Sequence, residues 1–191
     1  MHGLKNLIAA LAFIAPALGA PADPIPDRPA GLVGRDDAAV ADISAANCYI
    51  LTNNYLGSNV ALSSDGLTMR YYRTRDTSQI WRVQQTDQSG YYRLKPYPTG
   101  STRSLDVIND NGVNSNQVDL AETGNYSGQF WQFGKWSDGT YRLSNTFTGP
   151  SVHLDVYSDT HKAFLGTDDH SGQHWHMKSV KCPSGKGKDG H

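Results

Sequence analysis

A tripeptide that ends in tryptophan recurs three times along the chain and constrains its fold more than any other feature. The copies are Gln79-Ile80-Trp81, Gln129-Phe130-Trp131 and Gln173-His174-Trp175. Each Trp is followed two residues later by an apolar side chain, and residues two apart share one face of a strand. Each copy therefore predicts a strand with a buried Trp. Its Gln is expected at the mouth of that strand, where the amide can hold a neighbouring loop.

A second signature lies upstream of each tryptophan. It reads Tyr-x-Leu at residues 49–51, 92–94 and 141–143, and a further leucine follows eleven positions after each of these leucines. Two of the later leucines open a Leu-Asp-Val segment, at 105–107 and 154–156, whereas the first opens Leu62-Ser63-Ser64. These anchors keep the same register, and the tryptophans are 50 and then 44 residues apart. The pattern indicates three structural repeats of similar length.

The composition favours strands joined by tight turns. The chain has ten tyrosines, four tryptophans and nineteen glycines, and short alternating runs are separated by Gly, Asn, Asp and Ser. No segment after residue 48 carries apolar residues at helical spacing over three turns. This rhythm predicts an all-β fold, and threefold repetition favours a closed barrel with few free edges. A net charge of −1 with 18% charged residues argues against a nucleic-acid partner.

Changes in composition divide the chain into four segments. Residues 1–22 have the layout of a secretory signal peptide, with Lys5, an apolar run and then small residues. The run is too short for a membrane span, and a soluble amphipathic helix is the alternative. Residues 23–47 are expected to be a linker or propeptide, 48–182 the repeat domain, and 183–191 a disordered tail. The chain is therefore expected to be secreted and extracellular.

Two cysteines, Cys48 and Cys182, bracket the repeats. In a secreted chain an even number of cysteines predicts a disulfide, and two cysteines allow one intramolecular pairing. A reactive thiol is the alternative, but no Cys-His pattern surrounds either residue.

The three Gln-x-Trp motifs, with Leu-Asp-Val in two repeats, resemble the ricin-type (R-type) lectins, also called family 13 carbohydrate-binding modules. The resemblance covers about residues 48–182. It implies a β-trefoil, which is a six-stranded barrel capped by three hairpins, with room for one shallow sugar pocket per repeat. It also implies non-covalent binding of carbohydrate, with galactose-type sugars as the family default, by a monomer without a cofactor or catalysis.

The resemblance also implies which residues form a pocket. In the family, the Asp of Leu-Asp-Val accepts hydrogen bonds from sugar hydroxyls, an aromatic residue stacks on the sugar ring, and an Asn stands before the Gln. The first repeat has Ser63 in place of the Asp and is expected to be structural. A carboxylate in this segment has a second reading, because it can cap its own turn instead of binding a ligand.

The second repeat keeps Asp106 and Gln129, but its aromatic position falls near Ala121 and Gly128 replaces the Asn. Tyr126 is the substitute for the missing aromatic face.

The third repeat keeps Asp155 and Gln173, but its aromatic position falls near Gly166 and Gly172 replaces the Asn. The available substitutes are Tyr157, Phe164 and His170. Asn125-Tyr126-Ser127 is an N-glycosylation sequon beside the second pocket, so a glycan on Asn125 would obstruct it. The third repeat is therefore the preferred sugar pocket. In all three repeats, Gln79, Gln129 and Gln173 with Trp81, Trp131 and Trp175 are expected to be scaffold.

The sequence has three alternatives to sugar binding: a metal site, an enzyme and a protein-binding domain. Five histidines lie in the third repeat, and His174 with His176 and a loop histidine would suit zinc or copper, although polar residues alternating on a half-exposed strand explain them better. The chain lacks Gly-x-Ser-x-Gly, His-Glu-x-x-His and phosphate-loop motifs, so no enzyme and no metal site are predicted. The alternative function is a sugar-blind β-trefoil that acts through protein contacts, as an inhibitor or secreted effector, with loops such as 109–116 carrying the contacts.

Overall fold

The computed structural model describes residues 43–108 and 116–184, and their regular structure consists of strands and short 3₁₀ turns. The first repeat contains β1 (Cys48–Asn53), β2 (Val60–Ser63), β3 (Thr68–Tyr71) and β4 (Trp81–Gln85). The second contains β5 (Tyr92–Pro96), β6 (Arg103–Val107), β7 (Val118–Glu122) and β8 (Trp131–Lys135). The third contains β9 (Tyr141–Asn145), β10 (His153–Val156), β11 (Ala163–Gly166) and β12 (Trp175–Val180). The prediction of an all-β fold is confirmed. None of the described residues forms a helix long and apolar enough to cross a membrane.

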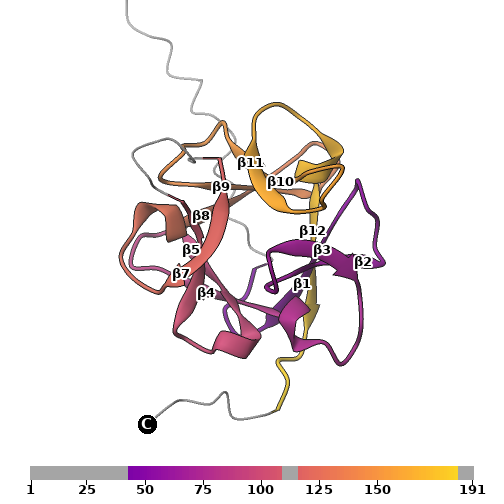
Figure 1. Cartoon of the computed structure of the whole chain (residues 1–191). Helices are drawn as coiled ribbons and strands as arrows, with labels where there is room; N and C mark the ends of the chain where they lie inside the picture. Colours follow the sequence, from indigo (N-terminus) through magenta and orange to yellow (C-terminus); the bar gives the residue numbers. More distant parts are fainter. Residues whose placement is uncertain (1–42, 109–115, 185–191) are drawn as a thin grey trace, which may run out of the picture. The chain divides into compact units, whose positions relative to one another are not determined.

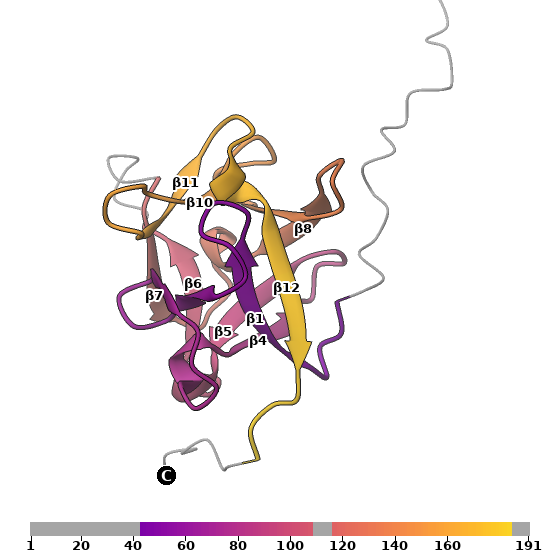
Figure 2. The ribbon, with the colours of Figure 1, turned by 90° about the vertical axis from the view of Figure 1, so that its right-hand side faces the viewer.

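Six strands close into an antiparallel barrel in the order β1-β12-β9-β8-β5-β4. The other six pair as the hairpins β2–β3, β6–β7 and β10–β11, which lie around the barrel (Figure 1). Each repeat thus gives its outer two strands to the barrel and its inner two to a hairpin. This is the β-trefoil that the resemblance implied. The barrel closes where β12 runs beside β1, from Cys48 opposite Val180 to Asn53 opposite Trp175 (Figure 2).

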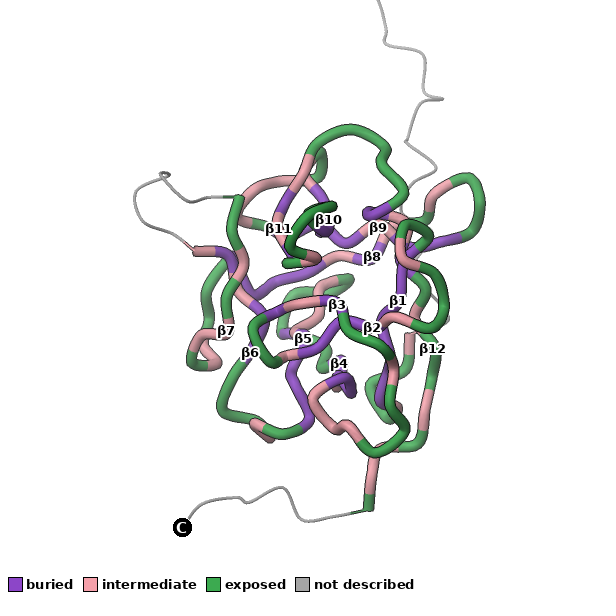
Figure 3. Tube along the Cα trace, turned by 45° about the vertical axis from the view of Figure 1, so that its right-hand side comes forward, coloured by how far each residue is buried: buried purple, intermediate pink, exposed green. Residues whose placement is uncertain are grey.

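The three tryptophans occupy equivalent positions in the core. Trp81, Trp131 and Trp175 are fully buried, and buried stretches follow the barrel strands in Figure 3. Each indole N–H donates to the carbonyl of the repeat's hairpin leucine, at 2.9 Å to Leu62, 2.9 Å to Leu105 and 2.8 Å to Leu154. A buried indole N–H needs such an acceptor. The tryptophan therefore ties each hairpin to the barrel in the same way, although it lies 19, 26 and 21 residues after the leucine in the three repeats.

The glutamine of each motif lies in a different place from the one predicted. It ends a 3₁₀ turn before the strand, in η1 (Thr77–Gln79), η3 (Ser127–Gln129) and η4 (Ser171–Gln173), and it is fully buried. The glutamine therefore lies just before the strand and outside its two-residue alternation, because a 3₁₀ turn has three residues per turn. Its amide hydrogen-bonds to the backbone of a neighbouring loop, as predicted. The turn directs the amide beneath the hairpin.

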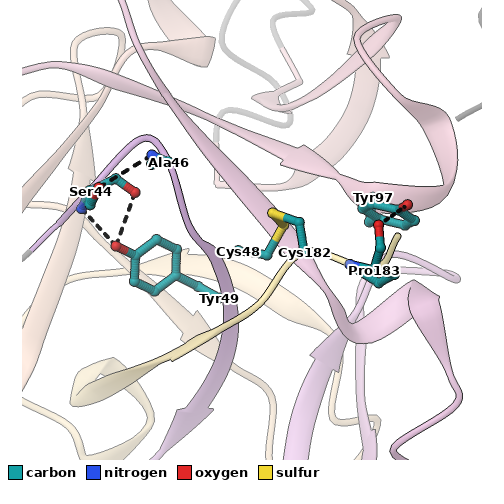
Figure 4. The surroundings of a disulfide bond; sticks show 7 residues. All are labelled: Ser44, Ala46, Cys48, Tyr49, Tyr97, Cys182 and Pro183. Carbon is teal, nitrogen blue, oxygen red and sulfur yellow. Dashed lines mark hydrogen bonds between the residues drawn. A yellow bond between two sulfur atoms is a disulfide. The ribbon is translucent and has the colours of Figure 1, made fainter. Parts of the chain in front are cut away.

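A disulfide joins Cys48 to Cys182, with the Cα atoms 5.0 Å apart, as predicted (Figure 4). It links the start of β1 to the segment that follows β12, beside the seam where the barrel closes. Next to it, the Tyr97 hydroxyl donates to the Pro183 carbonyl at 2.8 Å. The disulfide encloses a loop with a sequence separation of 134, so the chain-entropy model gives about 4–5 kcal/mol of stabilisation as an upper guide.

Several predicted segments fall outside the described residues. They are the signal peptide at 1–22, most of the linker at 23–47, most of the contact loop at 109–116 and most of the tail at 183–191.

Candidate functional site

In the second repeat, Asp106 is held by two hydrogen bonds within the domain. It lies in β6 and is half-buried. Its Oδ1 accepts from the N–H of Val107 at 2.7 Å, and its Oδ2 accepts from Nε2 of Gln129 at 2.8 Å. The first of these bonds is to a backbone N–H, as the second reading of this carboxylate expected, but it lies within β6 and caps no turn. Both bonds fix the orientation of the carboxylate.

Gln129 also holds the loop that follows β7. Its Nε2 donates to the Glu122 carbonyl at 2.8 Å, and its Oε1 accepts from the N–H of Gly124 at 3.0 Å. One buried amide therefore positions both the carboxylate and the loop opposite it.

A glycine precedes the glutamine in the second and third repeats, and the nearby Asp carboxylate leaves no space for a larger residue there. A Cβ added at Gly128 would lie 2.2 Å from Oδ1 of Asp106, and one added at Gly172 would lie 2.0 Å from Oδ1 of Asp155. These glycines were predicted to replace a family Asn, but neither position has room for a side chain.

In the first repeat, both the Asp and the Gly are replaced. Ser63 and Ser78 replace the Asp and the Gly, and their hydroxyls are hydrogen-bonded at 2.8 Å. The smaller Ser63 leaves room for a side chain at position 78. Gln79 donates to the carbonyls of Arg70 and Tyr71, so it holds the loop without orienting a carboxylate. This geometry fits the structural role predicted for the first repeat.

A cavity of about 570 Å³ opens over Asp106, and we call it the second-repeat cavity. Its lining includes Asp106, Asp119, Ala121, Asn125, Tyr126 and Phe147. Tyr126, the predicted substitute platform, is 60% exposed, and its ring lies against Gly124, where a Cβ would be 2.3 Å away. The aromatic wall from Phe147 was missed in the sequence, because this residue belongs to the following repeat, two positions after the end of β9.

The second-repeat cavity is acidic. Asp119 lies in β7 directly opposite Asp106, and its own Oδ1 accepts from the N–H of Leu120 at 2.7 Å. Burial raises the pKa of the Asp106 carboxyl above its usual value, and the charge of Asp119 adds to the rise. The hydrogen bonds from Gln129 and Val107 act in the opposite direction.

In the third repeat, Asp155 makes the same two contacts but is more enclosed. Its Oδ1 accepts from Val156 N–H at 2.7 Å and its Oδ2 from Nε2 of Gln173 at 3.1 Å. The side chain is 4% exposed. Gln173 also donates to the Thr167 carbonyl at 2.9 Å, while its Oε1 has no hydrogen-bond partner among the described residues.

The third-repeat cavity, which lies over Asp155, measures about 340 Å³ and is also lined by Tyr157, Phe164, His170 and Tyr55. The rings of Tyr157 and Phe164 are stacked with their centroids 3.9 Å apart, so each covers one face of the other. Tyr55 comes from the first repeat, two positions after the end of β1, as Phe147 does after β9. The structure therefore brings together all the predicted third-repeat residues, but in a narrower space than in the second repeat.

The His174 ring lies between two carboxylates. Its Nδ1 is 2.7 Å from Oδ2 of Asp138 and its Nε2 is 2.5 Å from Oδ1 of Asp169, while the ring stacks on Trp136 with centroids 4.9 Å apart. Burial lowers the pKa of His174, but the hydrogen bonds with Asp169 and Asp138 outweigh it and leave the pKa raised.

His176 contacts a different partner, the Oδ1 of Asn54, at 2.7 Å. Nδ2 of Asn54 in turn donates to Oδ2 of Asp138 at 3.1 Å, so one hydrogen-bond network joins the two histidines although they have different direct partners. Among residues 43–108 and 116–184, no group of three or more His, Cys, Asp or Glu residues is placed to hold a metal ion.

Comparison with known proteins agrees with this geometry. Residues 77–167 match the model of the family described as "Ricin-type beta-trefoil lectin domain-like". Comparison with curated protein sequences finds no significant match.

Similar solved structures include a mosquitocidal holotoxin, the designed threefold symmetric protein ThreeFoil, and SeviL bound to asialo-GM1 saccharide. Their sequence identities are 19%, 23% and 19%, their TM-scores are 0.58, 0.55 and 0.54, and they cover 73%, 70% and 72% of this chain. The match spans 18% of the holotoxin chain and 99% of each of the other two. At these identities the likeness establishes the fold alone.

Proposed function

We propose that this chain, which carries a ricin-type β-trefoil lectin-like domain, is a secreted, non-catalytic protein that binds glycans through the second-repeat cavity. The observation that carries the proposal is the pre-oriented Asp106 carboxylate at the base of a 570 Å³ cavity with aromatic side chains in its lining. The signal-peptide pattern and the disulfide support secretion, since disulfides persist in oxidising compartments.

The chemistry of the cavity suits a sugar. Each oxygen of Asp106 accepts one internal hydrogen bond, and a carboxylate oxygen can accept a second from a sugar hydroxyl. Bonds to an ionised carboxylate are about twice as strong as those between neutral groups. The rings of Tyr126 and Phe147 supply apolar surface for the C–H face of a pyranose.

The third-repeat cavity is proposed as a second, weaker site. Asp155 is oriented in the same way, but its burial and the smaller volume leave less room for a ring. The preference for the third repeat drawn from the sequence rested on the Asn125 sequon and stays untested, whereas the geometry favours the second repeat. A galactose-type ligand is proposed from the resemblance, and SeviL, a structural neighbour, is bound to the asialo-GM1 saccharide.

The test is a glycan array probed with the full chain, produced in a host without N-glycosylation so that Asn125 is bare. Asp106→Ala should weaken binding to an array hit about ten- to a hundredfold, because charge-assisted hydrogen bonds are lost. Asp106→Ala combined with Asp155→Ala should abolish it. Asp159→Ala is the matched control, because Asp159 also accepts the N–H of the next residue at 2.7 Å but lies in an exposed turn.

The alternative is the sugar-blind β-trefoil that acts through protein contacts. It is favoured by the fact that both carboxylates already accept hydrogen bonds from a backbone N–H and a glutamine. A folded chain that binds no glycan, or a double variant with unchanged affinity, would support this alternative and contradict the proposal.

A further inference from the structure

We infer that the second-repeat cavity is built for an amino sugar with a free, protonated amine rather than for a neutral or acidic sugar. This inference rests on the proposed function and gives that site a ligand class. It comes from the charges that line the cavity and from the way two repeats build its walls.

Two carboxylates face the cavity, and none of the described residues in its lining carries a positive charge. Asp106 and Asp119 are cross-strand partners on the β6–β7 hairpin, and both line the cavity. None of the described residues that line it is Lys, Arg or His. Asp119 is exposed, and among the described residues its carboxylate accepts one hydrogen bond, from the N–H of Leu120, so most of its acceptor capacity is open to a ligand.

The other cavities of the domain differ in this respect. The cavity beside β1 and β12 is lined by His176 and Lys178, and the one beside the β2–β3 hairpin by Arg70 and Arg73. The third-repeat cavity contains His170 beside its single carboxylate. Among these four cavities, the second-repeat cavity therefore has the most negative lining.

The walls of the second-repeat cavity suit a cation carried on a sugar ring. Tyr126 comes from the loop before η3, and Phe147 comes from the loop after β9, so the cavity has two aromatic residues from different repeats. Aromatic faces contact the C–H surface of a pyranose and also attract an ammonium group. An ammonium has three donors and no acceptor, which matches carboxylates that only accept.

The expected discrimination follows from the charges. One partly exposed ion pair at about 4 Å is worth a few-fold in affinity even at a water-like dielectric, so two carboxylates should give about tenfold or more at low salt. N-acetylation removes the positive charge of the amine, so an N-acetylated sugar does not gain this affinity. Acidic sugars should be excluded, because their carboxylate or sulfate would approach two like charges.

The experiment compares glucosamine and galactosamine oligosaccharides with their N-acetylated forms at about pH 6, where amines are protonated. Affinities are measured by calorimetry with the full chain bearing no glycan at Asn125. The free-amine form should bind at least about tenfold more tightly, and this ratio should fall as NaCl is raised, since salt screens exposed charges. Asp119→Asn should lower the ratio a few-fold, to the part that Asp106 alone supplies, whereas Asp159→Asn, the matched control on an exposed turn, should keep the wild-type ratio.

The outcomes separate this inference from the proposed function. If N-acetylated or other neutral sugars bind as tightly as the amines, the inference is overturned while the proposed function stands. If no glycan binds to the folded chain, both fail. A preference for amines that is undiminished in Asp119→Asn, or that does not change with salt in the wild-type chain, also overturns the inference. If the variant does not fold, the salt measurement decides.

Discussion

The coupling between Asp106 and Gly128 gives a quantitative prediction, because the first repeat has solved the same packing problem differently. We expect Gly128→Ser to destabilise the domain. Its Cβ would lie 2.2 Å from Oδ1 of Asp106 and 3.0 Å from the backbone nitrogen of Val107, and a backbone atom cannot move aside cheaply. Overpacking of this kind costs about 1–3 kcal/mol.

Asp106→Ser alone should also destabilise. It removes the 2.8 Å bond from Gln129 and the 2.7 Å bond from the Val107 N–H, and the loss of partners for buried donors costs about 1–3 kcal/mol. In the double variant the clash is absent, and two hydroxyls replace the pair as Ser63 and Ser78 do at 2.8 Å. The double variant should therefore be more stable than the sum of the single effects predicts, by about 1–3 kcal/mol.

Urea denaturation of the wild type and the three variants measures this coupling free energy directly. For a domain of this size, a loss of about 2 kcal/mol should appear as a melting temperature lower by roughly 5–8 °C. The same cycle at Gly172 and Asp155, where the added Cβ would be 2.0 Å from Oδ1, serves as an internal repetition. Strictly additive effects in both cycles would show that the two positions do not interact, and the packing argument would be refuted.

Three further predictions concern stability. Trp131→Ala should lower the free energy of unfolding by about 3–5 kcal/mol, because it empties a fully buried site; a melting temperature within a degree or two of wild type would contradict this. Reduction of the Cys48–Cys182 disulfide should destabilise the domain by no more than about 4–5 kcal/mol, measured by urea denaturation with and without reductant, and two free thiols in the oxidised protein would refute the pairing. The stability of the domain should depend on pH, because His174 and Asp138 form an ion pair. The pKa of His174 is raised, so the contribution of His174 to stability is complete below pH 6.5 and is lost as the pH rises through the folded-state pKa. The pKa of Asp138 is lowered, so its contribution is present above 3.8 and is lost as the pH falls through its folded-state pKa. Melting curves of wild type and His174→Ala should differ most between these two values, and an equal difference at pH 9 would contradict the reasoning.

The fold could be predicted from the sequence because its anchors are local and repeated. In every repeat the hairpin leucine follows the leucine of Tyr-x-Leu by eleven residues, and the Gln-x-Trp motif comes later. The indole N–H donates to the hairpin leucine carbonyl in all three repeats, although the two residues are 19, 26 and 21 positions apart. A pattern that three repeats satisfy in the same way needs no knowledge of long-range contacts.

The candidate site was only partly predictable, because its parts come from different repeats. Asp106 and Gln129 were found from the motif, and Tyr126 from its proximity to that motif. Phe147 was missed because it belongs to the third repeat, and no spacing within the second repeat points to it. The role of Gly128 was also misjudged, although the sequence held a signal: Ser-Gly-Gln accompanies Leu-Asp-Val, and Thr-Ser-Gln accompanies Leu-Ser-Ser.

The seam between β1 and β12 has a consequence for how the domain forms as it leaves the ribosome. β1 pairs with β12 over its whole length but with β4 only at Cys48 and Tyr49, so most of its backbone partners are synthesised last. Until β12 emerges, the first strand is an open edge able to pair with another nascent chain. The completed seam is then covalently fixed by Cys182, which lies just after β12. This cysteine pair can therefore be oxidised only after the third repeat has been synthesised, so the disulfide locks the seam late in the formation of the domain.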